Sequence, residues 1–273
     1  MYRILTSQVA WQTELDRLAP FEFTYFSNCT NADQLSKQCN INNIDAVLLF
    51  DYVTISILVA EDASANVIKD IPGLFPSAEV SIMEDKWVAY NWFNSHGYQV
   101  YLPKSKQPDD FPFVLKKPCS RGGEQVFLVN NKKEMDAIKG NLEKIIIQDY
   151  IASDYEYVYH FLALEGKVVI ERCDQHDLRE IAKQNGNYIR GKGCHNQNIK
   201  KYNLPKKHLD IFSSIIKELN FVGFGCFDFK LKDGSLYIIE LNTRMGGSLV
   251  FYNDKMNDFE SFMTAYMDLI SGH

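Results

Sequence analysis

The sequence lacks several features that would assign the chain to common classes of protein. Its six cysteines form no CxxC pair and no regular spacing, which is typical of reduced thiols in a cytosolic protein rather than of a disulfide framework or a zinc site. No apolar run approaches the roughly 18 residues of a membrane span, and residues 1–18 lack the apolar core of a signal peptide. We therefore expect a cytoplasmic protein with no membrane contact.

A basic excess and a dinucleotide fingerprint are also missing. Lys and Arg number 29 against 35 Asp and Glu, so the net charge is −6, and this argues against a general nucleic-acid binder. No GxGxxG motif occurs, so nothing points to a dinucleotide site. An acidic protein that binds a polyphosphate must gather its basic residues locally and use metal ions.

What is present is the composition of an ordinary globular protein, with 46% hydrophobic and 23% charged residues. The length suits two or three small domains or one large α/β unit. The first 80 residues predict an α/β domain, in which Tyr2–Leu5 and Ala46–Phe50 are strands and Ile55–Ala60 is either a strand or a helix. The composition leaves a homodimer open.

Residues 221–248 are the most informative stretch. Phe221–Leu231 is rich in aromatic residues and partly alternating, and Leu236–Asn242 is apolar with a polar end, so the pattern predicts the two strands of a β-hairpin. Between them, Asp233–Ser235 supplies a three-residue loop, which is a favoured hairpin connection when glycine lies near the left-handed region.

This loop length sets the register of the hairpin. It pairs Lys232 with Leu236, and therefore Asp228 with Glu240, and side chains directly opposite lie on one face. Two opposed carboxylates repel each other unless a cation lies between them, and Asn242 adds an amide oxygen on the same face. Oxygen ligands suit Mg²⁺ or Mn²⁺ rather than zinc. The alternative is an exposed edge hairpin with solvated acids.

Arg244 and the Gly246-Gly247 pair follow the hairpin and suit phosphate oxygens. An acid in an aromatic strand, a short glycine turn and the pattern apolar-apolar-Glu-x-Asn-x-Arg together resemble the metal-binding hairpin of ATP-grasp enzymes, most closely the biotin-carboxylase and carbamoyl-phosphate-synthase branch. The resemblance implies ATP and Mg²⁺ (or Mn²⁺) as cofactors. It assigns the metal-binding roles to Asp228, Glu240 and Asn242.

The resemblance covers about residues 81–270 and implies an α/β fold of the α+β ATP-grasp kind. We expect an N-terminal α/β domain over residues 1–80, a central ATP-grasp domain with a lid over 81–151, and a C-terminal ATP-grasp domain with the metal hairpin over 152–273.

The central domain starts at a predicted helix. Ser81 with Glu84 three residues later forms a capping box, and Met83 and Trp87 lie on one face of the helix that follows. The resemblance gives Lys86, in the first turn, a contact with the nucleotide phosphates. The alternative for this lysine is a solvated charge.

Residues 111–129 read as strand, loop and strand, and they resemble the lid hairpin of the family, whose lysine contacts the α-phosphate. Counting from the two flanking prolines selects either Lys116 or Lys117. Because strand alternation puts them on opposite faces, only one can face the nucleotide, and we favour Lys116. Gly122 and Gly123 allow backbone N–H groups to approach phosphate oxygens.

The segment Gln148, Asp149, Tyr150 and Ile151 resembles the hinge whose backbone groups read the adenine edge. Such a hinge needs accessible N–H and C=O groups beside an apolar wall. Glu156 follows at the spacing where an acid takes the ribose hydroxyls, and its alternative is a solvent-facing strand acid.

Arginines complete the set of candidate residues. Arg172 ends a strand and Arg190 lies in the polar stretch from residue 174 to 202, and both are candidates for a carboxylate or phosphate because a planar guanidinium binds these groups bidentately. Together with Arg244 they are the predicted catalytic residues. The alternative for Arg190 is an ordinary loop charge.

These residues predict an ATP-dependent ligase that joins a carboxylate to an amine through an acyl phosphate and releases ADP and phosphate. The partners implied are ATP, a small carboxylate and an amine. A second interpretation is a carboxylase-type subunit that activates bicarbonate. A third is an ATP-binding regulatory protein without turnover.

Overall fold

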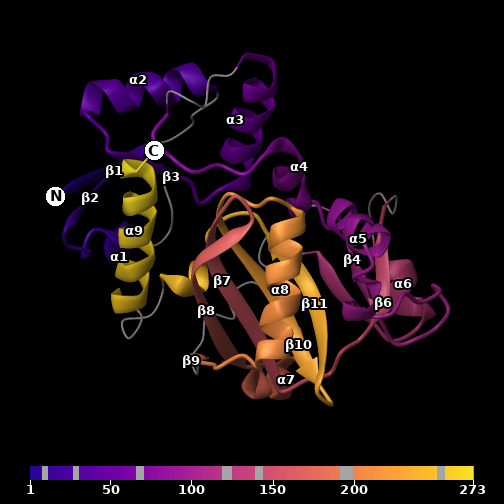
Figure 1. Ribbon diagram of the computed structural model, residues 1–273. Coiled ribbons are helices and arrows are strands. Elements are labelled where there is room, and N and C mark those ends of the chain that lie inside the picture. Colours follow the sequence, from indigo (N-terminus) through magenta and orange to yellow (C-terminus); the bar gives the residue numbers. More distant parts are fainter. Residues whose placement is uncertain are drawn as a thin grey trace.

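A computed structural model describes residues 1–7, 12–26, 31–65, 71–118, 125–138, 144–190, 199–250 and 256–272. The chain forms three sheets with helices around them (Figure 1). In this part of the chain, no helix is both long and apolar enough to cross a membrane.

The N-terminal unit is a parallel sheet with the strand order β2-β1-β3. Its strands are β1 (Tyr2–Ser7), β2 (Phe21–Phe26) and β3 (Ala46–Leu48), and its helices are α1 (Gln12–Leu15), α2 (Ala32–Asn42) and α3 (Tyr52–Ala65). The two predicted strands are confirmed, although the second ends earlier. Ile55–Ala60 is helical, and the sequence analysis missed β2 and α2.

A short helical segment leads into the central unit. It contains α4 (Ala78–Ser81), η2 (Ile82–Glu84), α5 (Lys86–Ser95) and η3 (Gln99–Tyr101). The small antiparallel sheet that follows has the order β5-β4-β6 and consists of β4 (Phe113–Lys116), β5 (Val126–Val129) and β6 (Ile146–Asp149), with α6 (Lys132–Ala137) beside it. Phe113, Leu115 and Val129 form a core on one face of this sheet.

The largest sheet is antiparallel and has the order β11-β10-β7-β8-β9. Its strands are β7 (Tyr155–Leu164), β8 (Lys167–Asp177), β9 (Ile199–Lys201), β10 (Gly223–Lys232) and β11 (Ser235–Asn242), and its helices are α7 (Arg179–Asn185), α8 (Lys206–Glu218), η4 (Gly247–Leu249) and α9 (Met256–Ser271). The predicted hairpin of residues 221–242 is confirmed, but β8 runs five residues beyond Arg172, where the sequence predicts that this strand ends.

Alternation along these strands gives the large sheet two different faces. One face is aromatic: Tyr159 and Phe227 stack on Phe212 of α8 with ring centroids 5.0 and 4.7 Å apart. Because side chains alternate between faces, Asp228 on β10 projects from the opposite face, and so does its partner Val158 on β7. The polar residues of the site therefore share the face that α8 does not cover.

Helix α9 joins the large sheet to the N-terminal unit and lies beside its strands (Figure 1). Phe259, Phe262 and Tyr266 are buried in a core that also contains Ile4 of β1 and Leu48 of β3. The N-terminal unit is thereby packed against the end of the large sheet.

Candidate active site

The hairpin of β10 and β11 pairs Asp228 with Glu240, as the sequence predicts, but by a different route. The turn has two residues, Asp233 and Gly234, with φ values of 51° and 75°. Positive φ at both positions is what a type I′ turn requires. Ser235 belongs to the strand and pairs with Lys232, so the expected three-residue loop is wrong.

A β-bulge restores the predicted register. The pairing shifts between Asp228 and Phe229, so that Phe229 pairs with Ile238, Asp228 pairs with Glu240, and Ile239 is the extra residue. A bulged residue drops out of the regular ladder, and the carbonyl oxygen of Ile239 accepts a hydrogen bond from Lys116 Nζ at 3.1 Å. The bulge thus aims a backbone oxygen at a lysine of the small sheet.

Both hairpin acids are ion-paired. Lys86 Nζ lies 2.9 Å from Glu240 Oε1, and Arg190 Nη2 lies 3.0 Å from Asp228 Oδ1. Asn242 Nδ2 donates to Asp228 Oδ2 at 3.2 Å. Burial raises the pKa of Asp228 to about 6, against the lowering effect of the neighbouring Arg190. Two carboxylates and an amide oxygen are therefore gathered on one face, and cations already stand beside the acids.

Lys86 reaches this site from the first residue of α5, where a cap different from the predicted one fixes the helix. Asp85, not Ser81, is the N-cap: its carboxylate accepts from the N–H groups of Trp87 and Val88 at 2.8 and 3.2 Å. The capping box is therefore wrong, because the segment before Asp85 is a separate short 3₁₀ turn. The lysine itself is only 7% exposed.

The two lysines at the end of β4 are separated as alternation predicts. Lys116 is 5% exposed and faces β11, and burial lowers its pKa to about 8, against the raising effect of Glu240. Lys117 Nζ instead lies 6.0 Å from the centroid of the Phe127 ring. The structure thus places Lys116 in the site and Lys117 on the other side of the strand.

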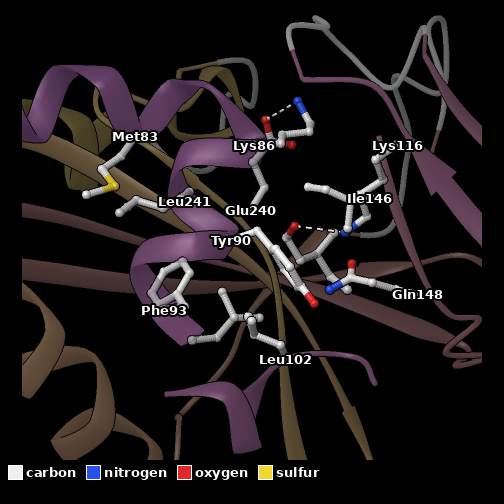
Figure 2. Close-up of a pocket in the computed structure, with 13 residues that line it drawn as sticks. Met83, Lys86, Tyr90, Phe93, Leu102, Lys116, Ile146, Gln148, Glu240 and Leu241 are labelled. Carbon is white, nitrogen blue, oxygen red and sulfur yellow. Dashed lines mark hydrogen bonds and ion pairs between the residues drawn. The ribbon is translucent and has the colours of Figure 1, made fainter. Parts of the chain in front are cut away.

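A cleft that is partly open to solvent lies between the small sheet, α5 and β11, and we call it the central cleft. Its walls include Lys86, Tyr90, Lys116, Gln148 and Glu240. In Figure 2 Lys86 approaches from the helix and Lys116 from the opposite wall, with the strand that carries Glu240 between them. The cleft combines apolar walls with two lysines at one end.

The predicted hinge meets the central cleft at Gln148, which is one of its lining residues. Gln148 is 3% exposed, and its side-chain Nε2 donates to the Pro103 carbonyl at 3.2 Å. The Asp149 N–H donates to the Lys104 carbonyl at 2.7 Å, and Tyr150 accepts through its hydroxyl from the Tyr188 N–H. Part of the hinge backbone is therefore already used within the protein.

Arg190 contacts two predicted site acids: Glu156, which the resemblance assigns to the ribose, and Asp228, which it assigns to the metal. Its Nε lies 3.0 Å from Glu156 Oε1, while its Nη2 contacts Asp228. Lys230, which the sequence analysis missed, donates to the carbonyls of Ile151 and Tyr188 at 3.2 and 2.6 Å. Its position two residues after Asp228, on the same strand face, is the signal that could have identified it.

Arg244 is held at the end of β11 by two contacts. Its Nη2 donates to Asn242 Oδ1 at 3.1 Å, and its Nε lies 3.5 Å from Glu84 Oε2. Glu84 also accepts from the Thr243 N–H at 2.7 Å, and burial raises the pKa of this acid, against the lowering effect of Arg244. Glu84 therefore supports the predicted arginine rather than capping a helix, a role that local sequence gave no sign of.

The structure places Arg172 away from the central cleft. It is 6% exposed, its Nε donates to Asp174 Oδ1 at 2.7 Å, and it forms an ion pair with Asp258 of α9. These contacts tie the large sheet to the C-terminal helix. Gly122 and Gly123 of the predicted lid lie outside the described residues.

The donor set fits a divalent cation that also has ligands from elsewhere. Asp228, Glu240 and Asn242 offer oxygen atoms, the type that Mg²⁺ and Mn²⁺ prefer. Within the described residues, no group of three or more His, Cys, Asp or Glu side chains could hold a metal ion alone. Phosphate oxygens of a bound nucleotide would complete such a shell.

Comparison with known proteins finds two relatives of similar sequence. A D-alanine–D-alanine ligase of Fusobacterium nucleatum is 30% identical over 152 residues, 54% of this chain and 52% of the relative, so the match spans about half the length of that protein. An uncharacterised Mycoplasma pneumoniae protein, an MG011 homologue, is 30% identical over 100 residues, 34% of each chain.

Solved structures with the same fold cover most of the chain. The ATP complex of a Bacillus anthracis D-alanine–D-alanine ligase aligns with a TM-score of 0.63 and 17% identity, over 98% of this chain and 96% of that one. An L-amino acid ligase of Bacillus licheniformis aligns with a TM-score of 0.60 and 16% identity, over 92% and 68%. These likenesses confirm the predicted fold class.

The family model for the ATP-grasp domain matches residues 83–248. This range contains the cap of α5, both lysines of the cleft, the hinge and the whole hairpin. The matched segment is more than half of the 273 residues, and the chain therefore belongs to the ATP-grasp family.

Proposed function

We propose that the protein is an ATP- and Mg²⁺-dependent ligase that joins a carboxylate to an amine through an acyl phosphate, releasing ADP and phosphate. The observation that carries this proposal is the opposition of Asp228 and Glu240 on one sheet face, with Lys86, Lys116 and Arg190 around them. Acids and cations gathered at one cleft suit a metal-bound triphosphate. The likeness to ligases of amino acids supports the same reaction class.

ATP would lie along the central cleft. The hinge from Gln148 to Ile151 would meet the adenine edge, and Glu156 the ribose hydroxyls. Lys86 and Lys116 would bind phosphate oxygens, and Gly122 and Gly123 would cover them. Mg²⁺ held by Asp228, Glu240 and Asn242 would neutralise the charge that develops on the phosphates.

Nucleotide binding then requires an exchange of partners. Lys86 and Arg190 now neutralise Glu240 and Asp228, and these acids must turn from the cations to the metal. The same cations gain phosphate oxygens in return, so that each charged group of the site keeps a partner of opposite sign. Arg190 thereby moves from two carboxylates to an anionic ligand, the kind of bidentate contact that guanidinium groups make well.

The reaction needs positioning and charge stabilisation rather than a protein nucleophile. A substrate carboxylate oxygen attacks the γ-phosphorus, the new O–P bond forms, and the bond to the β-phosphate oxygen breaks to release ADP. The amine nitrogen then attacks the acyl carbon, loses a proton, and displaces phosphate. Arg244, fixed by Glu84 and Asn242, would hold the carboxylate beside the transferred group.

The test separates the nucleotide products after turnover on a panel of small acids. ADP and phosphate are expected, and hydroxylamine should trap the activated acid as a hydroxamate without the natural amine. AMP and pyrophosphate as the main products would refute the mechanism. ATP hydrolysis that responds only to bicarbonate would favour a carboxylase-type subunit, and ATP binding with no product under any condition would favour a regulatory protein.

A further inference from the structure

A second hollow, partly open to solvent, lies between the N-terminal unit and the large sheet. It shares no described lining residue with the central cleft. Its polar side consists of Thr243 and Arg244, which directly follow the hairpin residue Asn242. A ligand in this hollow would therefore have one end beside the proposed phosphate-transfer site.

The remaining walls are apolar. Leu49 comes from the segment after β3, Ile55 from α3, Phe75 from the connection to α4, and Phe224 from β10. Arg244 is the only charged side chain among the described residues that line the hollow. An apolar pocket with one fixed cation is complementary to an anion with an apolar body. The same set of described lining residues contains no acid that could receive an ammonium group.

The guanidinium of Arg244 is positioned before any ligand arrives. Its Nη2 is used by Asn242 and its Nε by Glu84, and neither contact involves Nη1. Both contacts fix the plane of the group, so that binding loses little side-chain freedom. A carboxylate bound to Arg244 would lie near Asn242, a proposed metal ligand that is two residues earlier in the chain.

Hydrogen bonds also hold the walls of the hollow in place. Tyr266 of α9 donates through its hydroxyl to the Val47 carbonyl at 2.5 Å, and the Leu74 N–H donates to the same hydroxyl at 3.3 Å. A Cβ atom added at Gly223 would lie 2.8 Å from the Leu74 carbonyl oxygen, so the connection packs directly on the start of β10. The hollow is thus a fixed shape between two units.

We propose that this hollow selects the acid substrate as a monocarboxylic acid with an aliphatic or aromatic body and no ammonium group beside its carboxylate. The carboxylate lies on Arg244 and the body on Phe75, Ile55 and Phe224. This inference rests on the proposed ligase function and narrows the acid substrate of that reaction from small acids in general to apolar ones.

The experiment measures binding and turnover separately. 4-Methylpentanoate and phenylacetate are titrated against leucine and succinate, by calorimetry with ADP and Mg²⁺ present and by hydroxamate formation with ATP. The apolar acids are expected to bind about tenfold more tightly or better. Phe75→Asp should weaken 4-methylpentanoate about tenfold while ADP affinity reports an intact fold, and Val169→Asp, at an exposed surface position, should not. Arg244→Met should abolish acid binding, and Arg244→Lys should restore part of it.

Each outcome separates the two claims. Binding and turnover of leucine or succinate with inert apolar acids would overturn the apolar class and leave the ligase standing. Unchanged affinity for 4-methylpentanoate in Phe75→Asp would place the acid elsewhere. AMP as product would refute the ligase mechanism, while the binding titrations would still show whether the hollow takes an apolar acid.

Discussion

Replacing Lys116 by Met should stabilise the free protein while removing nucleotide affinity. The lysine is 5% exposed, and burial lowers its pKa from 10.5 to about 8. Such a depression corresponds to about 3 kcal/mol of unfavourable free energy for the charged form at neutral pH. The substitution also removes the hydrogen bond to the Ile239 carbonyl, which reduces the gain in stability by about 1 kcal/mol. The Met side chain fills the same space as the lysine. We expect a net gain of about 2 kcal/mol at pH 7.

The gain should depend on pH in a defined direction. Between pH 8 and 10.5 the unfolded chain still holds the Lys116 proton and the folded protein does not, so the stability of the wild type rises with pH there. Lys116→Met has no such titration. The difference in unfolding free energy between Lys116→Met and the wild type is therefore largest below pH 8 and disappears towards pH 10.5.

Urea unfolding without nucleotide, at pH 7 and at pH 9.5, measures both quantities, and ATP titration gives the affinity. Lys117→Met is the matched control, since that lysine lies over the Phe127 ring outside the cleft; its effect should stay within about 0.5 kcal/mol. Destabilisation by Lys116→Met, or a gain that is the same at both pH values, would refute the claim that a buried charge is held at this position.

Three further predictions concern the same cleft. Glu240→Gln should abolish turnover and, because Lys86 already neutralises this acid, should lower the metal-free melting temperature; activity close to wild type would remove the metal assignment. Arg190→Met should destabilise the free protein by about 2–4 kcal/mol, because it leaves Glu156 and Asp228 without their cation. The control Arg179→Met, at an exposed position, should change the urea unfolding curve little. Equal effects of the two substitutions would contradict the bridging role of Arg190. ATP binding at pH 9 should take up protons, because phosphate oxygens favour the charged form of Lys116; calorimetry in buffers of different ionisation enthalpy measures this uptake, and none would be seen if the lysine faced away.

Local sequence patterns were sufficient to predict the strands that carry the main residues of the site. Residue pattern predicted the two strands of the hairpin, the assumed loop length predicted the pairing of Asp228 with Glu240, and alternation along β4 separated Lys116 from Lys117. The register was right although the turn was wrong. The shorter turn and the bulge cancel each other in the register. The Asp233-Gly234 pair is typical of a two-residue turn, whereas the bulge leaves no distinct mark in residue types.

Contacts between distant segments could not be predicted in the same way. Glu84 reads as a helix-capping residue because its sequence neighbours fit that pattern, yet its carboxylate meets Thr243, which is 159 positions away. For Arg190 the sequence allows either a substrate-binding arginine or an ordinary loop charge, and neither interpretation predicts its contacts with Glu156 and Asp228. In both cases the partner is chosen by tertiary packing, which periodicity does not encode.

The bulge at Ile239 separates the hairpin tip from the two acids that the strands align. Removing or adding one residue on each strand beyond the bulge shortens or lengthens the tip and leaves the pairing of Asp228 with Glu240 unchanged. The tip is open, with no atom within 4 Å of a Cβ added at Gly234, and it is tied only lightly to α8, where Lys207 Nζ donates to the Gly234 carbonyl at 3.1 Å. Residues 233–234 are therefore a natural place to insert a foreign peptide, such as an affinity tag or a fluorophore acceptor sequence, into the folded protein.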